Sequence, residues 1–119
     1  MNILVVDDNN LTLKTYNEKL TQAHYNVDCA NNGDQALQLA YQNPAKYDLI
    51  LMDLQMPIKS GYETATEMRQ HGIQIPIIAM SVNAFAEKVQ KIEAAGMNTY
   101  IPKPLSISAL NAAITRLHS

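Results

Sequence analysis

The polar residues that could do chemistry in this 119-residue sequence sit directly after its apolar runs. They are Asp7, Asp8, Asp53, Ser81 and Lys103. Three carboxylates brought together repel one another and raise each other's pKa, so such a cluster needs a cation. A hard, oxygen-ligated ion suits it, and Mg²⁺ takes one or two carboxylates together with waters and phosphate oxygens.

The lysine and the serine extend this chemistry. Lys103 adds a fixed positive charge, the hydroxyl of Ser81 can donate a hydrogen bond, and Asp53 is left as a nucleophile. A carboxylate can attack phosphorus to give an aspartyl phosphate while Mg²⁺ and lysine neutralise the phosphoryl oxygens. These residues therefore predict a site that holds a phosphoryl group on Asp53.

The elements that must position these residues can be predicted from apolar periodicity. Five short apolar runs predict buried strands at residues 3–6, 27–30, 49–52, 77–80 and 100–101. Helical spacing fills the segments between them. Asn32 and Ser106 are expected to cap the start of helices, and Gly72 and Gly96 to end them.

Strands that are apolar on both faces and joined by helices imply an α/β fold, a parallel sheet with helices on both faces and right-handed connections. The carboxyl ends of such strands share one edge, where ligands bind, so the five polar side chains should converge there. The length suits one domain over residues 1–119, and no linker or repeat divides it.

Composition excludes several classes of function. A net charge of -2 gives no broad basic surface for nucleic acid or anionic lipid, and no apolar segment is long enough to cross a membrane. The glycine patterns of dinucleotide and P-loop sites are missing from the sequence. The single cysteine, Cys29, predicts a buried thiol in a reducing compartment, and we expect a cytoplasmic location.

Four motifs in order along essentially the whole chain resemble the receiver domains of two-component response regulators. They are VVDDN at residues 5–9, LMDLQMP at 51–57 running to Gly61, IAMS at 78–81 and YIPKP at 100–104. The resemblance implies a flavodoxin-like, doubly wound sheet of five parallel strands in the order 2-1-3-4-5.

The resemblance also implies roles for the acidic residues. Asp53 would be the phosphoacceptor, taking a phosphoryl group from a phosphohistidine. Asp7 and Asp8 would hold Mg²⁺ together with Asp53 and the backbone carbonyl of Gln55, with Asp8 as a direct ligand. No other cofactor is implied.

Further roles implied by the resemblance concern the last two strands. Ser81 and Lys103 would grip the phosphoryl oxygens. Tyr100 would be a switch aromatic that turns inward when Ser81 moves toward the phosphate, although a core-edge aromatic is an equally good interpretation. The Lys103–Pro104 peptide bond would be cis.

The sequence departs from the usual pattern of this family near the proposed site. Val82 stands where alanine or glycine is usual, and its bulk should narrow access to Asp53. Asn83 and Gln55 occupy positions that tune the lifetime of the phosphate in this family. Ser81 replaces the commoner threonine and keeps the hydroxyl.

The expected partners are a sensor histidine kinase, a histidine phosphotransfer domain, or both. The stretches LMDLQMP and AGMNTY, at residues 51–57 and 95–100, resemble receivers of hybrid sensor histidine kinases, so we expect a domain cut from the cytoplasmic part of a larger, membrane-bound kinase. A homodimer could form through the last helix–strand–helix face. No output domain follows in these 119 residues, and the only expected catalysis is the domain's own phosphorylation and dephosphorylation.

Two alternatives remain open at this level. A degenerate receiver could act as an interaction module that never carries phosphate, and saturable Mg²⁺ binding would distinguish the two. An Mg²⁺-dependent phosphatase would need a substrate pocket and a general acid, which the sequence does not indicate.

The remaining polar and soft residues have simpler interpretations. His24, His71 and His118 should be surface residues without metal-ligand spacing. Asp28 and Asp48 should be solvated charges. The methionines are expected to fill gaps in the core.

Overall fold

A five-stranded parallel sheet forms the centre of the computed structural model, which describes residues 1–82 and 89–118. Its strands are β1 (Asn2–Val6), β2 (Asn26–Ala30), β3 (Leu49–Asp53), β4 (Ile77–Ser81) and β5 (Thr99–Pro102). They are ordered β2-β1-β3-β4-β5, and every neighbouring pair is parallel. The predicted strands and the predicted sheet order are both confirmed.

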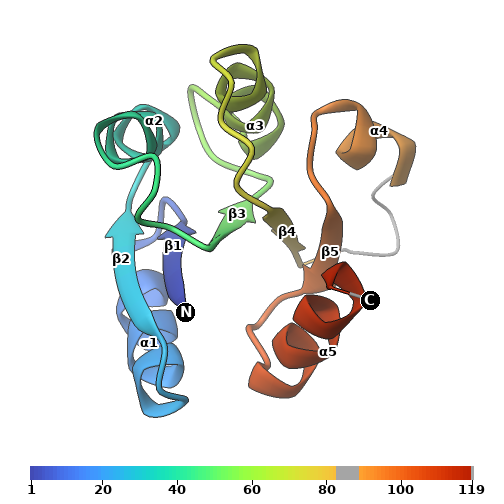
Figure 1. Cartoon of the computed structure of the whole chain (residues 1–119). Coiled ribbons are helices and arrows are strands. Elements are labelled where there is room, and N and C mark those ends of the chain that lie inside the picture. The colour runs from blue at the N-terminus through green and yellow to red at the C-terminus, as the bar shows by residue number, and fades with distance from the viewer. Residues whose placement is uncertain (83–88, 119) are drawn as a thin grey trace.

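Helices cover both faces of this sheet (Figure 1). They are α1 (Asn10–Gln22), α2 (Gly33–Gln42), α3 (Gly61–Gln70), α4 (Val89–Ala94) and α5 (Ile107–Leu117). Helices α1 and α5 lie on one face, and α2, α3 and α4 lie on the other. The α/β architecture predicted from the strand and helix alternation is therefore confirmed.

The two core clusters explain why the central strands are apolar along most of their length and polar only at their ends. In β1, Ile3 and Val5 pack toward α1 and α5, whereas Leu4 and Val6 pack toward α2 and α3. Alternate residues of a strand point to opposite faces, so a strand covered on both sides buries all of them. All five residues of β3 and of β4 are likewise buried.

Local signals set the helix ends as predicted. The side chain of Asn32 accepts a hydrogen bond from the Gln35 N–H, and that of Ser106 accepts one from the Ala109 N–H. Gly72 and Gly96 follow α3 and α4 with φ of +80° and +89°, the left-handed region that favours glycine.

Several minor predictions are confirmed and one is wrong. The three histidines are exposed, and the methionines Met52, Met56, Met68, Met80 and Met97 are buried. Asp28 is not simply solvated, because its carboxylate pairs with Lys46 at 2.8 Å and accepts a hydrogen bond from the Tyr47 hydroxyl at 2.7 Å. Both partners belong to the segment that precedes β3, so the spacing of residues along β2 could not predict these contacts.

Other predictions are confirmed only in part or lie outside the structure's description. Cys29 is half-buried, and burial raises the pKa of its thiol. Asn83 lies outside the described residues. None of the described helices is long and apolar enough to cross a membrane.

Candidate functional site

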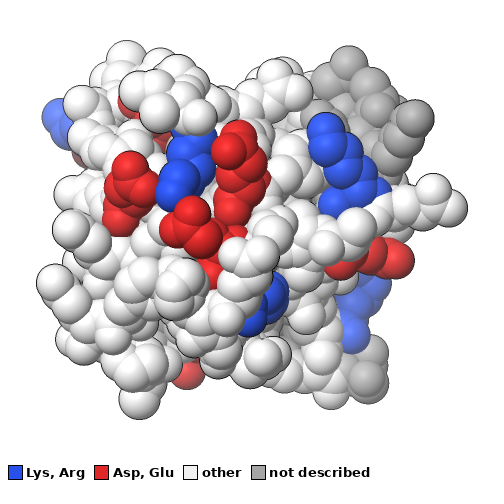
Figure 2. Space-filling view, turned by 90° about the horizontal axis from the view of Figure 1, so that it is seen from above, with Lys and Arg blue, Asp and Glu red and all other residues white. Residues whose placement is uncertain are grey.

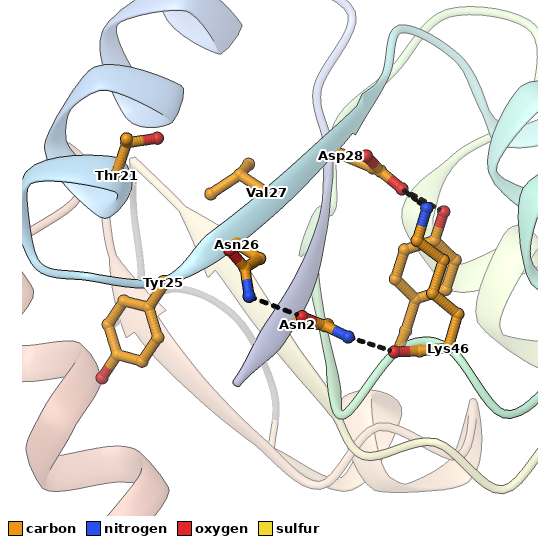
Figure 3. Close-up of a pocket in the computed structure, with 8 residues that line it drawn as sticks. Asn2, Thr21, Tyr25, Asn26, Val27, Asp28 and Lys46 are labelled. Atoms are coloured by element: carbon orange, nitrogen blue, oxygen red, sulfur yellow. Dashed lines mark hydrogen bonds and ion pairs between the residues drawn. The ribbon is translucent and has the colours of Figure 1, made fainter.

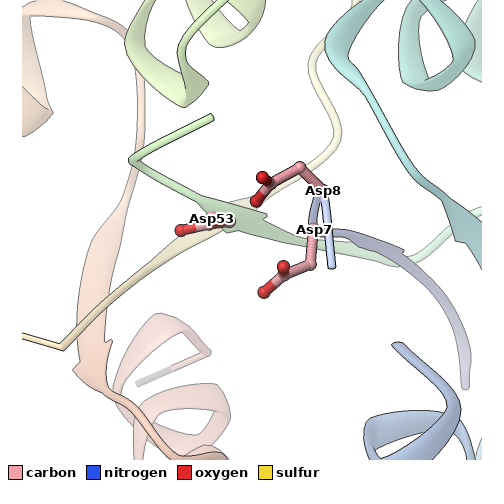
Figure 4. A group of neighbouring side chains, drawn as sticks. All are labelled: Asp7, Asp8 and Asp53. Atoms are coloured by element: carbon pink, nitrogen blue, oxygen red, sulfur yellow. The ribbon is translucent and has the colours of Figure 1, made fainter. Parts of the chain in front are cut away.

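Three carboxylates meet at the carboxyl edge of the sheet. Asp7 and Asp8 follow β1 and Asp53 ends β3, and each offers an oxygen that lies within 4.8 Å of the others (Figure 4). Asp7 and Asp53 are buried and Asp8 is exposed. The neighbouring, parallel positions of β1 and β3 produce this convergence, because their carboxyl ends face the same way.

Lys103 joins two of these carboxylates from the end of β5. Its Nζ lies 2.8 Å from Asp7 Oδ2 and 3.1 Å from Asp53 Oδ1. Burial alone would lower the pKa of Lys103, but the hydrogen bond to Asp7 and the charge of Asp53 outweigh it, and the net result is a raised pKa. The lysine therefore stays charged inside the site.

The electrostatics of Asp53 show that one lysine does not neutralise the cluster. Burial, followed by the charge of Asp7, raises the pKa of Asp53 to about 6, against the lowering effects of Lys103 and of the Gln55 backbone N–H. That N–H donates to Asp53 Oδ1 at 3.2 Å. A carboxylate with a raised pKa among other carboxylates is stabilised by a further cation.

The donor atoms fit a hard divalent cation. The three clustered groups that could bind a metal ion are all carboxylates, and because Asp8 is exposed the site is open to solvent on one side. Mg²⁺ binds oxygen ligands and keeps several waters, which an open, oxygen-only site allows. The carbonyl of Gln55 belongs to the segment that directly follows Asp53.

Ser81 and Tyr100 lie on the strands beside this cluster. Ser81 is buried at the end of β4, one residue beyond the partner of Asp53 in the sheet register, and its carbonyl accepts a hydrogen bond from the Lys103 N–H at 2.9 Å. Tyr100 is half-buried on β5 and pairs with Ala79. The Lys103–Pro104 bond is cis, as the resemblance implied.

Close packing also fixes the backbone of Asp53. Gly61 begins α3, its N–H donates to the Leu54 carbonyl at 3.1 Å, and a Cβ at Gly61 would lie 2.2 Å from the carbonyl oxygen of Asp53. Only glycine permits this approach.

Seen from above, acidic side chains gather around lysine on this face of the molecule (Figure 2).

Two residues near the site had not been singled out from the sequence. Tyr16 is a buried residue of α1; burial raises the pKa of its phenol, and the nearby charge of Lys103 lowers it. The sequence feature that could have indicated Tyr16 is a hydroxyl-bearing residue on the helix face that Leu13 and Leu20 otherwise make apolar. Lys59 pairs with Asp34 and with Glu67, and no local pattern indicates contacts across two helices.

A second concave region lies away from this chemistry. An open pocket of about 420 Å³ sits near the amino ends of β1 and β2 (Figure 3). Its polar groups largely satisfy one another: the Asn26 amide donates to Asn2, and Lys46 pairs with Asp28. Nothing in it converges on a reacting group.

Comparison with known proteins is consistent with the geometry of the acidic site. The family model described as the response regulator receiver domain matches residues 3–115. The signal transduction histidine-protein kinase BarA of Escherichia coli K12 is 36% identical over 118 residues, which cover 98% of this chain and 13% of that kinase. Hybrid signal transduction histidine kinase I of Dictyostelium discoideum is 34% identical over 119 residues, covering 94% of this chain and 7% of that protein.

Solved structures agree in fold. The receiver domain of the sensor histidine kinase PA1611 from Pseudomonas aeruginosa, with a magnesium ion in its active-site cleft, matches with a TM-score of 0.83 and 32% identity over 97% of this chain and 94% of that one. The receiver of Saccharomyces cerevisiae Ssk1, solved with the phosphotransfer protein Ypd1, matches with a TM-score of 0.83 and 29% identity over 97% and 86%.

Proposed function

The chain belongs to the response regulator receiver domain family, and we propose that residues 1–119 form the Mg²⁺-dependent phosphoacceptor domain of a two-component phosphorelay. The observation that carries this proposal is the convergence of Asp7, Asp8 and Asp53 within 4.8 Å, with Lys103 on two of them. A degenerate receiver has no need of this full set of charges, so its retention favours the active form.

In the proposed reaction, Asp53 is the nucleophile. One of its carboxylate oxygens forms a bond to phosphorus as the bond from phosphorus to the imidazole nitrogen of the donor breaks. Lys103, already 3.1 Å from Asp53, would contact the transferred phosphoryl group, and the Ser81 hydroxyl would donate to one of its oxygens. Hydrolysis of the aspartyl phosphate by water returns the carboxylate.

Asp7, Asp8, Asp53 and the Gln55 carbonyl would hold Mg²⁺, with Asp8 as a direct ligand and Asp7 oriented by Lys103. When bound, the ion would neutralise charge on the phosphoryl oxygens. The Asp7 carboxylate is fixed on both oxygens, by Lys103 at 2.8 Å and by the Asn9 N–H at 3.0 Å. The Asp7 carboxylate is thus held in place before any ligand arrives.

Phosphorylation would act as a switch through the last two strands. A phosphoryl group adds about -1.5 to -2 of charge and new acceptor oxygens. Ser81 would move toward it, and Tyr100, half-buried on the neighbouring strand, would follow. The face formed by α4, β5 and α5 is the surface on which we expect output contacts or a homodimer.

The proposed partner is a histidine kinase or a histidine phosphotransfer domain, as Ypd1 is for Ssk1. Three large apolar side chains support a docking surface around the site: Leu11, Ile58 and Val82 are 75%, 101% and 78% exposed. Each follows the carboxyl end of a different strand, so an approaching partner would meet all three at the acidic edge.

The proposed location is the cytoplasm.

Phosphorylation by acetyl phosphate tests the proposal. We expect the wild-type chain to gain the mass of one phosphoryl group with Mg²⁺ and not with EDTA, and Asp53→Asn to gain none. Asp48→Asn, which alters an exposed carboxylate that accepts from the Asn2 N–H, is the control and should behave as wild type. Phosphorylation of Asp53→Asn, or none of the wild type, would contradict the proposal.

A further inference from the structure

The loop between β3 and α3 holds a β-branched residue in a conformation that such residues rarely adopt. Ile58 has a φ of +70°, and the Lys59 N–H donates to the Pro57 carbonyl at 2.8 Å. A three-residue hydrogen-bonded turn with positive φ at its centre is the rare, strained form of the γ-turn. Strain of this kind persists only where the surrounding structure holds it.

Lys59 provides contacts that can hold the turn. Its Nζ lies 2.9 Å from Asp34 Oδ1 on α2 and 2.9 Å from Glu67 Oε1 on α3. Its side-chain stem lies against the start of α2, where a Cβ on Gly33 would be 3.0 Å from Lys59 Cδ. One side chain therefore ties the loop to both neighbouring helices.

The same loop borders the proposed metal site. A hollow of about 240 Å³ separates the loop from the start of α2, with Asp8 on its lining beside Met56, Pro57, Ile58 and Lys59. Gln55 lies between Asp53 and this strained turn, and its N–H is bonded to Asp53 Oδ1. A shift of the turn would thus move the backbone on which the proposed carbonyl ligand lies.

We propose that Lys59 is a positioning residue for the Mg²⁺ and phosphoryl site. Through Asp34 and Glu67 it holds the turn at Ile58, and so fixes the Gln55 carbonyl relative to Asp8 and Asp53. This inference rests on the proposed function, since it concerns the geometry of that site.

Electrostatics alone predicts that loss of the Lys59 charge would raise the Mg²⁺ affinity, whereas a positioning role predicts that it would lower it. The direction of the change in affinity therefore tests the inference. Removing the positive charge of Lys59, which lines the same hollow as Asp8, should strengthen Mg²⁺ binding by Coulomb's law. Loss of a positioning contact should weaken it, because groups that orient metal ligands commonly contribute 10-fold or more to affinity.

The experiment is an NMR titration of the whole chain with MgCl₂ at constant ionic strength, for wild type, Lys59→Met and Lys59→Arg. We expect Lys59→Met to bind Mg²⁺ about 10-fold more weakly, and Lys59→Arg to remain near wild type because it keeps the charge and reach. Lys46→Met is the matched control, since it removes an ion pair of 2.8 Å at the opposite edge, and it should leave the affinity unchanged.

A second variant separates positioning from general loss of structure. Glycine adopts positive φ without strain, so in an Ile58→Gly background Lys59→Met should cost less Mg²⁺ affinity than it does alone. Urea midpoints measured in parallel identify any variant that is simply less folded. A purely structural role would lower the midpoint and leave the affinity of the folded protein unchanged.

Unchanged or tighter Mg²⁺ binding by Lys59→Met would overturn the inference while leaving the proposed function intact. An equal loss with and without Ile58→Gly would overturn the role of the strained turn. Failure of the wild-type chain to bind Mg²⁺ would instead overturn the proposed function, and the inference with it.

Discussion

Lys103 and Asp7, 96 residues apart in the sequence, form an ion pair of 2.8 Å between side chains that are 15% and 1% exposed. The same ammonium reaches Asp53 at 3.1 Å. One cation is thus shared by two buried carboxylates, with Asp8 as a third acidic group nearby. The site is poised to accept positive charge, and its stability should depend on the charges it already holds.

Removing the shared cation should destabilise the protein. Lys103→Met leaves two buried carboxylates without their partner, and we expect the free energy of unfolding in EDTA at pH 7 to fall by about 3 kcal/mol. Lys46→Met breaks an exposed pair with Asp28 and should cost less than about 1 kcal/mol. Urea unfolding measures both, and equal losses would refute the role of burial.

The raised pKa of Asp53 gives the metal-free protein a defined pH dependence. The pKa of about 6 in the folded state exceeds the ordinary aspartate pKa of 3.8, so the folded state binds this proton more tightly and stability falls as pH rises from about 4 to 6. Asp53→Asn should therefore be more stable than wild type above pH 6, by up to about 3 kcal/mol.

That difference should shrink to less than about 1 kcal/mol near pH 4, close to the unfolded pKa of 3.8, and vanish at lower pH, where the carboxyl is neutral in both states. Urea unfolding in EDTA at several pH values between 4 and 8 checks this, with Asp48→Asn as an exposed control. A stability difference that stays constant across this range would show that Asp53 titrates normally.

Gly61 should tolerate no side chain. A Cβ there would lie 2.2 Å from the Asp53 carbonyl oxygen and 2.9 Å from Leu54 Cα, both backbone atoms, so Gly61→Ala should cost about 2 kcal/mol or more and abolish phosphorylation. Gly72→Ala meets nothing within 4 Å and should carry only the left-handed penalty of about 1 kcal/mol. Its phosphorylation, followed by intact mass, should match wild type.

Val82 should lengthen the life of the aspartyl phosphate. Val82 directly follows Ser81, so shortening its side chain in Val82→Ala should admit water more readily and speed hydrolysis of the aspartyl phosphate. Because Val82 is 78% exposed, the same change should alter the free energy of unfolding by less than about 0.5 kcal/mol. Loss of phosphoryl mass after removal of acetyl phosphate gives the rate. Val89→Ala, on α4, is the control, and identical lifetimes for all three proteins would reject this role.

The sequence by itself determined where the five strands lie, which strand and helix faces are mostly buried, and where two of the helices begin. Burial of a strand or helix face is a property of each residue in turn, so periodicity located all five strands, and the capping side chains of Asn32 and Ser106 marked two helix starts. It also placed Asp7, Asp53 and Lys103 at strand ends, and parallel pairing then required those ends to share one edge.

Tertiary structure alone decided which charges pair. Lys103 divides its contacts between Asp7 and Asp53, Lys59 joins Asp34 to Glu67, and Asp28 is held by Lys46. No local period encodes these pairs, because each depends on how two elements distant in sequence pack against the sheet and on the reach of a flexible lysine. The residues of the site follow from the pattern of the chain, whereas its electrostatics follow from the packing of its helices and loops.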